Sequence, residues 1–101
     1  MIRVVLVDDQ ELVRSGLRRI LATTDDVEVV AECSDGDEVQ TAVWEHSPDV
    51  VVMDIRMKRM DGVEATKRLR EREGSPPVLV LTTFDDDELL SAALRAGAAG
   101  F

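Results

Sequence analysis

Cysteine, aromatic residues and clustered basic residues are all scarce in this sequence. Its 101 residues include one cysteine, Cys33, and no tyrosine beside one tryptophan and two phenylalanines. A lone cysteine cannot form an internal disulfide, so a reducing compartment fits the chain. The formal net charge of −9 argues against a nucleic-acid-binding surface, because phosphate backbones attract clustered Lys and Arg. The few aromatic side chains offer no platform for stacking bases.

Long apolar segments are also missing. The chain has no N-terminal signal segment and no run that approaches the length of a membrane span, so we expect a cytoplasmic domain without a membrane partner. The hydrophobic share of 45% and the charged share of 33% are ordinary for a globular protein and exclude wholesale disorder. No repeat or linker interrupts the chain, and residues 1–101 are expected to form one domain.

Apolar runs alternate with helical patterns along the chain. Strands are predicted at 2–7, 27–31, 49–53 and 78–81, with the start of a fifth at 97–101. Helices are predicted at 10–22, 37–46, 61–72 and from 85 to about 96. In the first helix Val13, Leu17, Ile20 and Leu21 form the expected inner face, and Arg14, Arg18 and Arg19 the outer one. This alternation predicts an α/β fold, a doubly wound parallel sheet with right-handed crossovers and strand order 2-1-3-4-5.

Two apolar strands end in carboxylates. Asp8 and Asp9 follow the first strand, and Asp54 follows the third. In this strand order the two strands are neighbours, and ligands bind at their carboxyl ends, so the three acids are expected to converge. Two such charges about 4 Å apart repel by roughly 4 kcal/mol at an effective dielectric near 20. An oxygen-only site of this kind suits Mg²⁺, and no second His or Cys suggests zinc.

The acid cluster predicts phosphoryl chemistry. Beside bound Mg²⁺ one carboxylate can attack phosphorus and form an aspartyl-phosphate. Asp54 is the better nucleophile because it follows the most apolar strand, which leaves Asp8 and Asp9 as metal ligands. Thr82, at the end of the fourth strand, has a hydroxyl that can donate to a phosphoryl oxygen. The alternative is purely structural: Asp is a good helix N-cap, and Thr is common at strand ends.

The same residues carry a family resemblance over essentially the whole chain, from Ile2 to Phe101. The chain resembles the receiver domain of bacterial response regulators, the phosphoacceptor half of two-component signalling. The matching motifs are Val7-Asp8-Asp9, Asp54, Met60-Asp61-Gly62, Leu81-Thr82 and Gly97-Ala98-Ala99-Gly100-Phe101. Their combined spacing is specific, whereas any one of them alone is weak.

The resemblance implies roles for individual residues. Asp54 matches the phosphorylated aspartate, and Asp8 and Asp9 match the acidic Mg²⁺ pocket. Arg56 matches the position that lends a backbone carbonyl to the metal. Thr82 and Phe101 match the switch hydroxyl and the switch aromatic. The implied protein is a phosphoacceptor, not a turnover enzyme, and its implied partner is a sensor histidine kinase.

Two segments, Asp8-Asp9-Gln10-Glu11-Leu12-Val13-Arg14 and Leu81-Thr82-Thr83-Phe84-Asp85, resemble those of the NarL/LuxR-type subfamily. Its members carry a C-terminal helix-turn-helix that binds DNA, and that module is not in these 101 residues. The family's essential Lys, the rest of the fifth strand and the fifth helix would also follow Phe101. The sequence thus resembles a receiver domain cut at the fifth strand, and uncovered apolar sheet surface would favour a homodimer or a domain swap. Lys58 stands where the family usually has Pro, which predicts altered dephosphorylation or partner choice.

Three other functions fit the same architecture less well. A flavin or nucleotide binder needs a first loop rich in Gly, Ser and Thr, whereas Asp8-Asp9-Gln10 would repel phosphate unless a metal intervened. An aspartyl phosphatase prefers its nucleophile and acid two residues apart on the first strand, whereas here Asp8 is followed immediately by Asp9. A receiver-like interaction module that is never phosphorylated stays open, because the family's Lys is absent from these residues.

Overall fold

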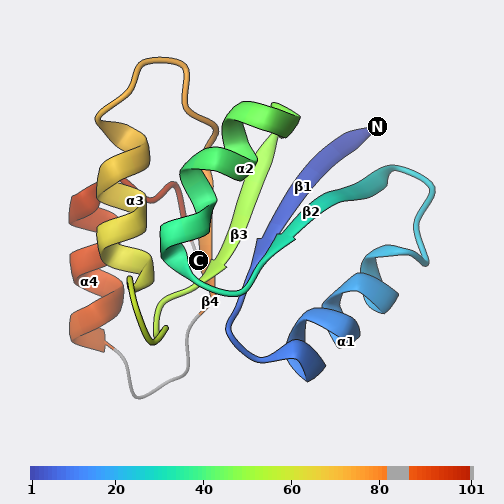
Figure 1. The fold of residues 1–101 in the computed structure, drawn as a ribbon, viewed down its shortest axis with the longest axis horizontal. Coiled ribbons are helices and arrows are strands. Elements are labelled where there is room, and N and C mark those ends of the chain that lie inside the picture. Colours follow the sequence, from blue (N-terminus) through green and yellow to red (C-terminus); the bar gives the residue numbers. More distant parts are fainter. Residues whose placement is uncertain (82–86, 101) are drawn as a thin grey trace.

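A four-stranded parallel sheet organises the computed structural model, which describes residues 1–81 and 87–100. Its strand order is β2-β1-β3-β4. The strands are β1 (Ile2–Val7), β2 (Val27–Cys33), β3 (Val50–Asp54) and β4 (Val78–Leu81). The helices are α1 (Glu11–Leu21), α2 (Val39–His46), α3 (Gly62–Arg70) and α4 (Asp87–Ala96), with a short 3-10 turn, η1 (Gly36–Glu38), before α2. The predicted parallel α/β fold is confirmed (Figure 1).

The chain after α4 returns to the sheet beside β4. Leu79 and Gly100 form a parallel bridge, and the Val80 N–H donates to the Gly100 carbonyl at 3.0 Å. This bridge lies where the sequence predicts the start of a fifth strand. Phe101 falls outside the described residues.

Element boundaries differ from the predicted ones by a few residues. β2 continues to Cys33 because its pairing with β1 extends to the end of that strand, where Val7 lies opposite Cys33. The predicted helix at 37–46 is divided into η1 and α2, and α3 ends at Arg70. The third strand is shifted by one residue, so Asp54 is its last member.

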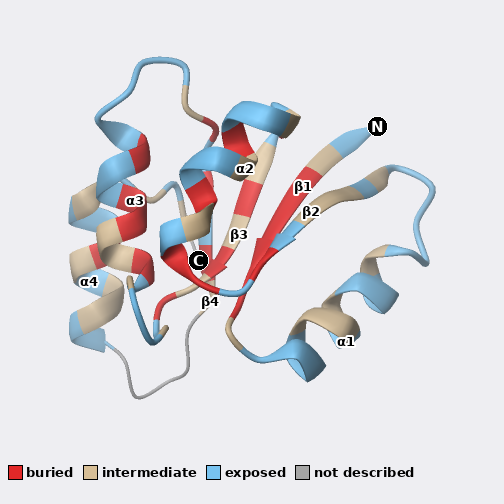
Figure 2. Ribbon diagram, viewed as in Figure 1, coloured by how far each residue is buried: buried red, intermediate tan, exposed pale blue. Residues whose placement is uncertain are grey.

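The core lies between one face of the sheet and three helices. Alternation along the strands places every second side chain on this face, and α2, α3 and α4 cover it (Figure 2). The buried strand residues of this core cluster are Val5, Val7, Cys33, Val51, Met53, Val78 and Val80. They pack with Val43 of α2, Leu69 of α3 and Ala93 of α4, which belong to the same cluster.

Helix α1 lies apart from the other three helices, beside β2 (Figure 1). None of its residues is buried: Val13 is 38% exposed and Ile20 is 64% exposed. The predicted outer position of Arg14 is wrong. Its side chain is only 15% exposed, and it donates to the backbone carbonyl of Asp8 and to the Glu32 carboxylate.

An aromatic contact joins the ends of α2 and α3. The guanidinium carbon of Arg72 lies 4.0 Å from the centre of the Trp44 ring, a cation–π geometry. Trp44 therefore packs at the edge of the fold instead of filling the core. No helix in the described part of the chain is long and apolar enough to cross a membrane.

Candidate metal centre

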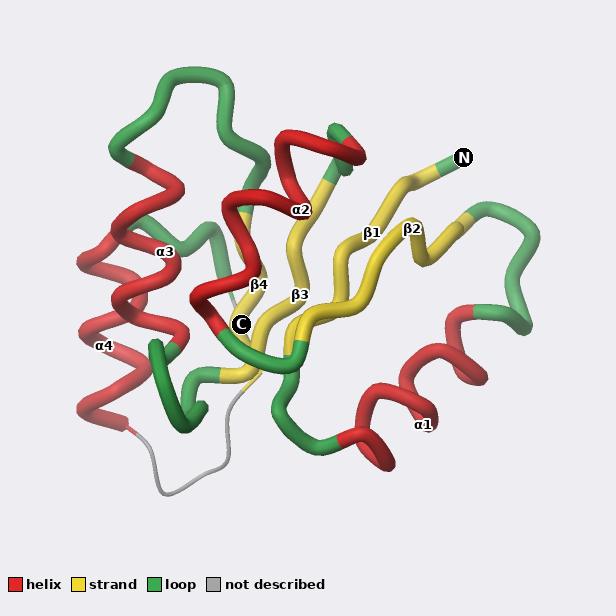
Figure 3. The backbone as a smooth tube through the Cα atoms, in the orientation of Figure 1, coloured by secondary structure: helices red, strands yellow, loops and turns green. Residues whose placement is uncertain are grey.

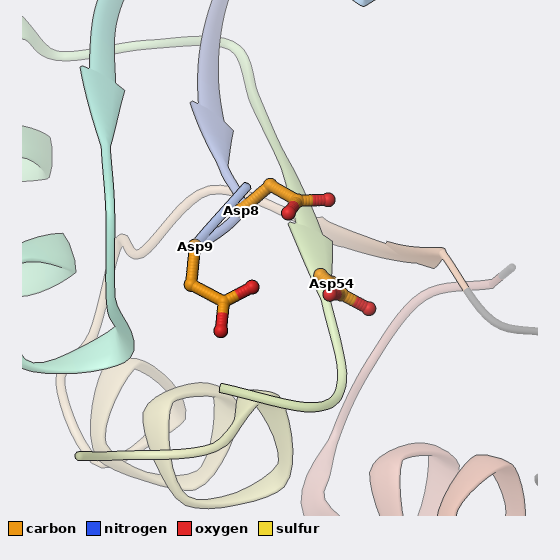
Figure 4. Close-up of side chains that lie close together, drawn as sticks. All are labelled: Asp8, Asp9 and Asp54. Atoms are coloured by element: carbon orange, nitrogen blue, oxygen red, sulfur yellow. The ribbon is translucent and has the colours of Figure 1, made fainter. Parts of the chain in front are cut away.

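Three carboxylates meet at one end of the sheet. The parallel register places Val7 opposite Met53, so Asp8 and Asp54, the next residues, leave neighbouring strands at the same end. The loops after β1, β2 and β3 all lie at that end (Figure 3). Asp8, Asp9 and Asp54 each offer a carboxylate oxygen, and these oxygens lie within 4.8 Å of one another (Figure 4). The structure thus brings together the three acids that the sequence singled out.

Backbone hydrogen bonds fix Asp8. Its N–H donates to the Cys33 carbonyl at 3.1 Å, which extends the β1–β2 pairing into the site. Its Oδ1 accepts from the N–H of Gln10 at 2.8 Å. Gln10 is the N-cap of α1, and its own side chain makes no capping hydrogen bond. Asp8 and Asp9 precede the N-cap position, so neither is the N-cap that a purely structural interpretation of the pair requires.

The clustered charges change the acidity of the site. Burial, followed by the charge of Asp8, raises the pKa of Asp54 to about 6, although the backbone N–H groups of Arg56 and Ile55 act to lower it. Burial also raises the pKa of Asp8, and the charge of Asp9 adds to the effect. The Gln10 N–H and the Arg14 guanidinium oppose that rise. The folded chain therefore holds anionic groups that a cation would stabilise.

The loop after Asp54 comes back against the site. The Gly62 N–H donates to the Ile55 carbonyl at 2.7 Å. A Cβ at Gly62 would lie 2.4 Å from the Asp54 carbonyl oxygen, so only glycine fits at this close approach. Asp61 then starts α3 by accepting the N–H of Glu64 at 2.9 Å. The motif Met60-Asp61-Gly62 therefore ends the loop after β3 and begins helix α3.

Sequence reasoning missed one residue of this region, Asp35. The Asp35-Gly36 pair reads as a surface turn, yet the Asp35 side chain is only 1% exposed. Its carboxylate accepts the backbone N–H groups of Arg59 at 2.9 Å and Met60 at 2.7 Å. Burial acts to raise the pKa of Asp35, but these N–H bonds outweigh burial and hold the pKa below its ordinary value. An Asp-Gly pair gives no sequence signal that distinguishes this arrangement from an exposed turn.

The remaining predicted residues divide into two groups. Arg56 lies in the loop directly after β3, two residues beyond Asp54. Thr82 and Phe101 fall outside the described residues, so their switch roles stay predictions.

The donor set fits Mg²⁺. All three ligands are carboxylates, and Mg²⁺ prefers oxygen donors, of which it commonly takes one or two carboxylates and several waters. At 4.8 Å, two unit charges repel by about 3 kcal/mol at an effective dielectric of 20. A divalent cation between Asp8, Asp9 and Asp54 would remove that repulsion.

Fold and site together define a doubly wound domain with an acidic cluster at the switch point between β1 and β3. Comparison with known proteins identifies the family within this class of doubly wound domains. The response regulator receiver domain matches residues 4–101, and the chain belongs to that family, a component of two-component signalling.

Several named relatives are similar to this chain along essentially its whole length. The transcriptional regulatory protein LiaR of Bacillus subtilis is 46% identical over 101 residues, which cover 100% of this chain and 48% of LiaR. The oxygen regulatory protein NreC of Staphylococcus haemolyticus is 41% identical over 100 residues, or 46% of its length. The chain thus spans about half of these relatives. The receiver domain of the putative response regulator NarL from Mycobacterium tuberculosis has a TM-score of 0.92 and 38% identity, with 99% of this chain and 81% of that one covered.

Proposed function

We propose that this chain is a Mg²⁺-dependent phosphoacceptor and that Asp54 is the residue phosphorylated. The observation that carries the proposal is the convergence of the Asp8, Asp9 and Asp54 carboxylates within 4.8 Å. Membership of the receiver family supports a sensor histidine kinase as the phosphodonor. The chemistry is a single transfer onto the protein, not turnover of a substrate.

In the proposed transfer step, the phosphoryl group moves from a phosphohistidine to Asp54. A carboxylate oxygen of Asp54 attacks the phosphorus of a phosphohistidine, and the P–N bond breaks. The imidazole leaves with the electron pair and takes up a proton, while Asp54 becomes an acyl phosphate. Attack of water on that phosphorus later returns the carboxylate and inorganic phosphate.

The residues around Asp54 supply binding and orientation. Asp8 and Asp9 would hold the metal, with the backbone carbonyl of Arg56 as a further ligand. When bound, Mg²⁺ neutralises charge on the phosphoryl group. The N–H groups of Ile55 and Arg56 lie close enough to lower the pKa of Asp54, so they favour its reactive carboxylate form. The pKa of about 6 leaves Asp54 mainly ionised at neutral pH.

In a longer parent protein the phosphorylated domain would switch an output domain. The transcriptional relatives and the resemblance to NarL/LuxR-type regulators support a DNA-binding output. Thr82 and Phe101 are the proposed switch residues. Location in the cytoplasm follows from the same proposal, because a histidine kinase presents its phosphohistidine there.

Intact mass spectrometry tests the acceptor. The chain is incubated with Mg²⁺ and acetyl phosphate beside an Asp54→Asn variant and an Asp25→Asn control, whose substitution lies in an exposed turn. We expect one phosphoryl adduct on the wild type and on the control when Mg²⁺ is present. No adduct should form on either when Mg²⁺ is chelated from the start, and none should form on Asp54→Asn. An adduct that persists on Asp54→Asn would place the acceptor elsewhere.

Absence of any adduct leads to a second experiment on a chain that extends past Phe101. An adduct there alone assigns the failure to the residues that follow Phe101, among them the family's Lys. No adduct on either chain would favour the phosphorylation-independent interaction module over the phosphoacceptor.

A further inference from the structure

The loop between β3 and α3 is held by a side chain from another loop. Residues 55–61 contain no proline, so no ring restricts their backbone. Asp35, between β2 and η1, accepts the N–H of Arg59 at 2.9 Å and the N–H of Met60 at 2.7 Å, one on each carboxylate oxygen. The Met60 carbonyl in turn accepts the N–H of Gly36 at 3.2 Å. Two loops that are distant in sequence are thereby joined through backbone groups.

The space between the two loops is too small for a substitute side chain. A Cβ at Gly36 would lie 2.4 Å from the Met60 carbonyl oxygen, so the backbones are in direct contact. Asp35 is 1% exposed, and a buried carboxylate is costly unless its oxygens are hydrogen-bonded. Two of the N–H groups that satisfy it, those of Arg59 and Met60, belong to the loop that follows Asp54, and the backbone of Asp37 supplies a further one.

A second link between the loops lies at the surface and serves as a comparison. The Arg59 guanidinium donates to both Asp37 oxygens, at 2.7 and 3.1 Å, and to Glu38 at 3.1 Å. The Arg59 side chain is 59% exposed, and exposed ion pairs contribute little because solvent screens them. Of these two side-chain links, the restraint on the loop backbone therefore comes mainly from Asp35.

We propose that Asp35 is a positioning residue for the acidic site: by fixing the backbone at Arg59 and Met60 it holds the 55–61 loop, and with it the backbone groups of Ile55 and Arg56 beside Asp54. The proposal rests on the proposed function, in which these backbone groups act on Asp54 and on its metal. Asp35 touches neither and acts only through the loop. Partners that orient the groups around a metal typically change its affinity about 10- to 100-fold when removed.

Mg²⁺ titration by calorimetry on four versions of the chain tests this role. The versions are the wild type, Asp35→Ala, Asp35→Asn and Asp37→Ala, each checked for folding by circular dichroism. We expect Asp35→Ala to raise the half-saturating Mg²⁺ concentration roughly 10- to 100-fold. Asp35→Asn keeps one acceptor oxygen and should lie between Asp35→Ala and the wild type, whereas Asp37→Ala removes only the surface pair and should match the wild type. If Asp35→Ala does not fold, the comparison of Asp35→Asn with Asp37→Ala decides.

The role is overturned if the Asp35 variants bind Mg²⁺ as the wild type does, or if Asp37→Ala weakens binding equally. Amide hydrogen exchange separates this result from a failure of the proposed function. If the wild type itself binds no Mg²⁺, the proposed function fails, and exchange at Ile55 and Arg56 alone decides the role of Asp35. Exchange there that is about tenfold faster in Asp35→Ala supports the hold on the loop, and unchanged exchange refutes it.

Discussion

Asp54→Asn should stabilise the metal-free domain at neutral pH. The pKa of Asp54 lies at about 6 in the folded chain against an ordinary 3.8, so the folded state binds the proton more tightly than the unfolded state does. Stability is then lost as pH rises from about 4 to about 6, and the ionised acid destabilises the fold above that range. Asparagine removes the titrating charge and keeps the shape of the side chain.

The magnitude follows from the two pKa values. Each unit of difference corresponds to about 1.4 kcal/mol, which sets an upper bound of about 3 kcal/mol. Asp54 is only partly buried, and solvent screening lowers the expected gain to about 1–2 kcal/mol. In a domain of this size each kcal/mol shifts the melting temperature by about 4–8 °C.

Thermal unfolding followed by circular dichroism measures the effect. Wild type and Asp54→Asn are compared in chelator at neutral pH and at a pH about one unit below the ordinary pKa of 3.8, where the difference between them should nearly vanish because Asp54 is then mainly protonated in both the folded and the unfolded state. Added Mg²⁺ should stabilise the wild type and have a smaller effect on the variant. An Asp25→Asn control in an exposed turn should leave the midpoint unchanged. A melting temperature for Asp54→Asn equal to or below the wild-type value at neutral pH would refute the proposed repulsion.

Substitutions at three further positions test the parts that support the site. Leu69→Ala opens the fully buried core contact of α3 and should cost about 2–5 kcal/mol in urea unfolding; a loss of less than about 1 kcal/mol would contradict this packing. Asp61→Ala removes the cap of α3 and should cost about 1 kcal/mol, whereas Asp61→Asn should keep most of it in the same assay. Gly62→Ala forces a Cβ against the Asp54 carbonyl and should abolish Mg²⁺ binding in calorimetry; binding at wild-type affinity would show that the loop adapts.

The strands and the acids were predictable because their signals are local. A run of Val and Leu that ends in Asp is visible in sequence, and the parallel arrangement of β1 and β3 follows from the alternation of strands with helices. These two facts place Asp8 beside Asp54 without any knowledge of side-chain positions. The carboxyl ends of neighbouring parallel strands lie at the same end of the sheet, which brings the two acids together.

The supporting contacts were not predictable because they join segments distant in sequence. Arg14 has the spacing of a solvated helix face, yet it turns back to the Asp8 carbonyl and to Glu32 on β2. Asp35 lies 24 residues before Arg59, and only the folded sheet brings them together. Such contacts depend on the exact distance between loops, which residue types and periodicity do not encode.

The Trp44–Arg72 contact gives the domain a single optical probe of folding. Trp44 is the single tryptophan and no tyrosine is present, so the near-ultraviolet emission comes from one side chain. It lies in the last turn of α2, and that end of α2 is at the opposite end of the sheet from the loops that follow β1 and β3 (Figure 1). Its fluorescence should therefore report the separation of α2 from α3 on unfolding and stay constant while the acidic site fills. Unfolding can then be followed by fluorescence without interference from the occupancy of the acidic site.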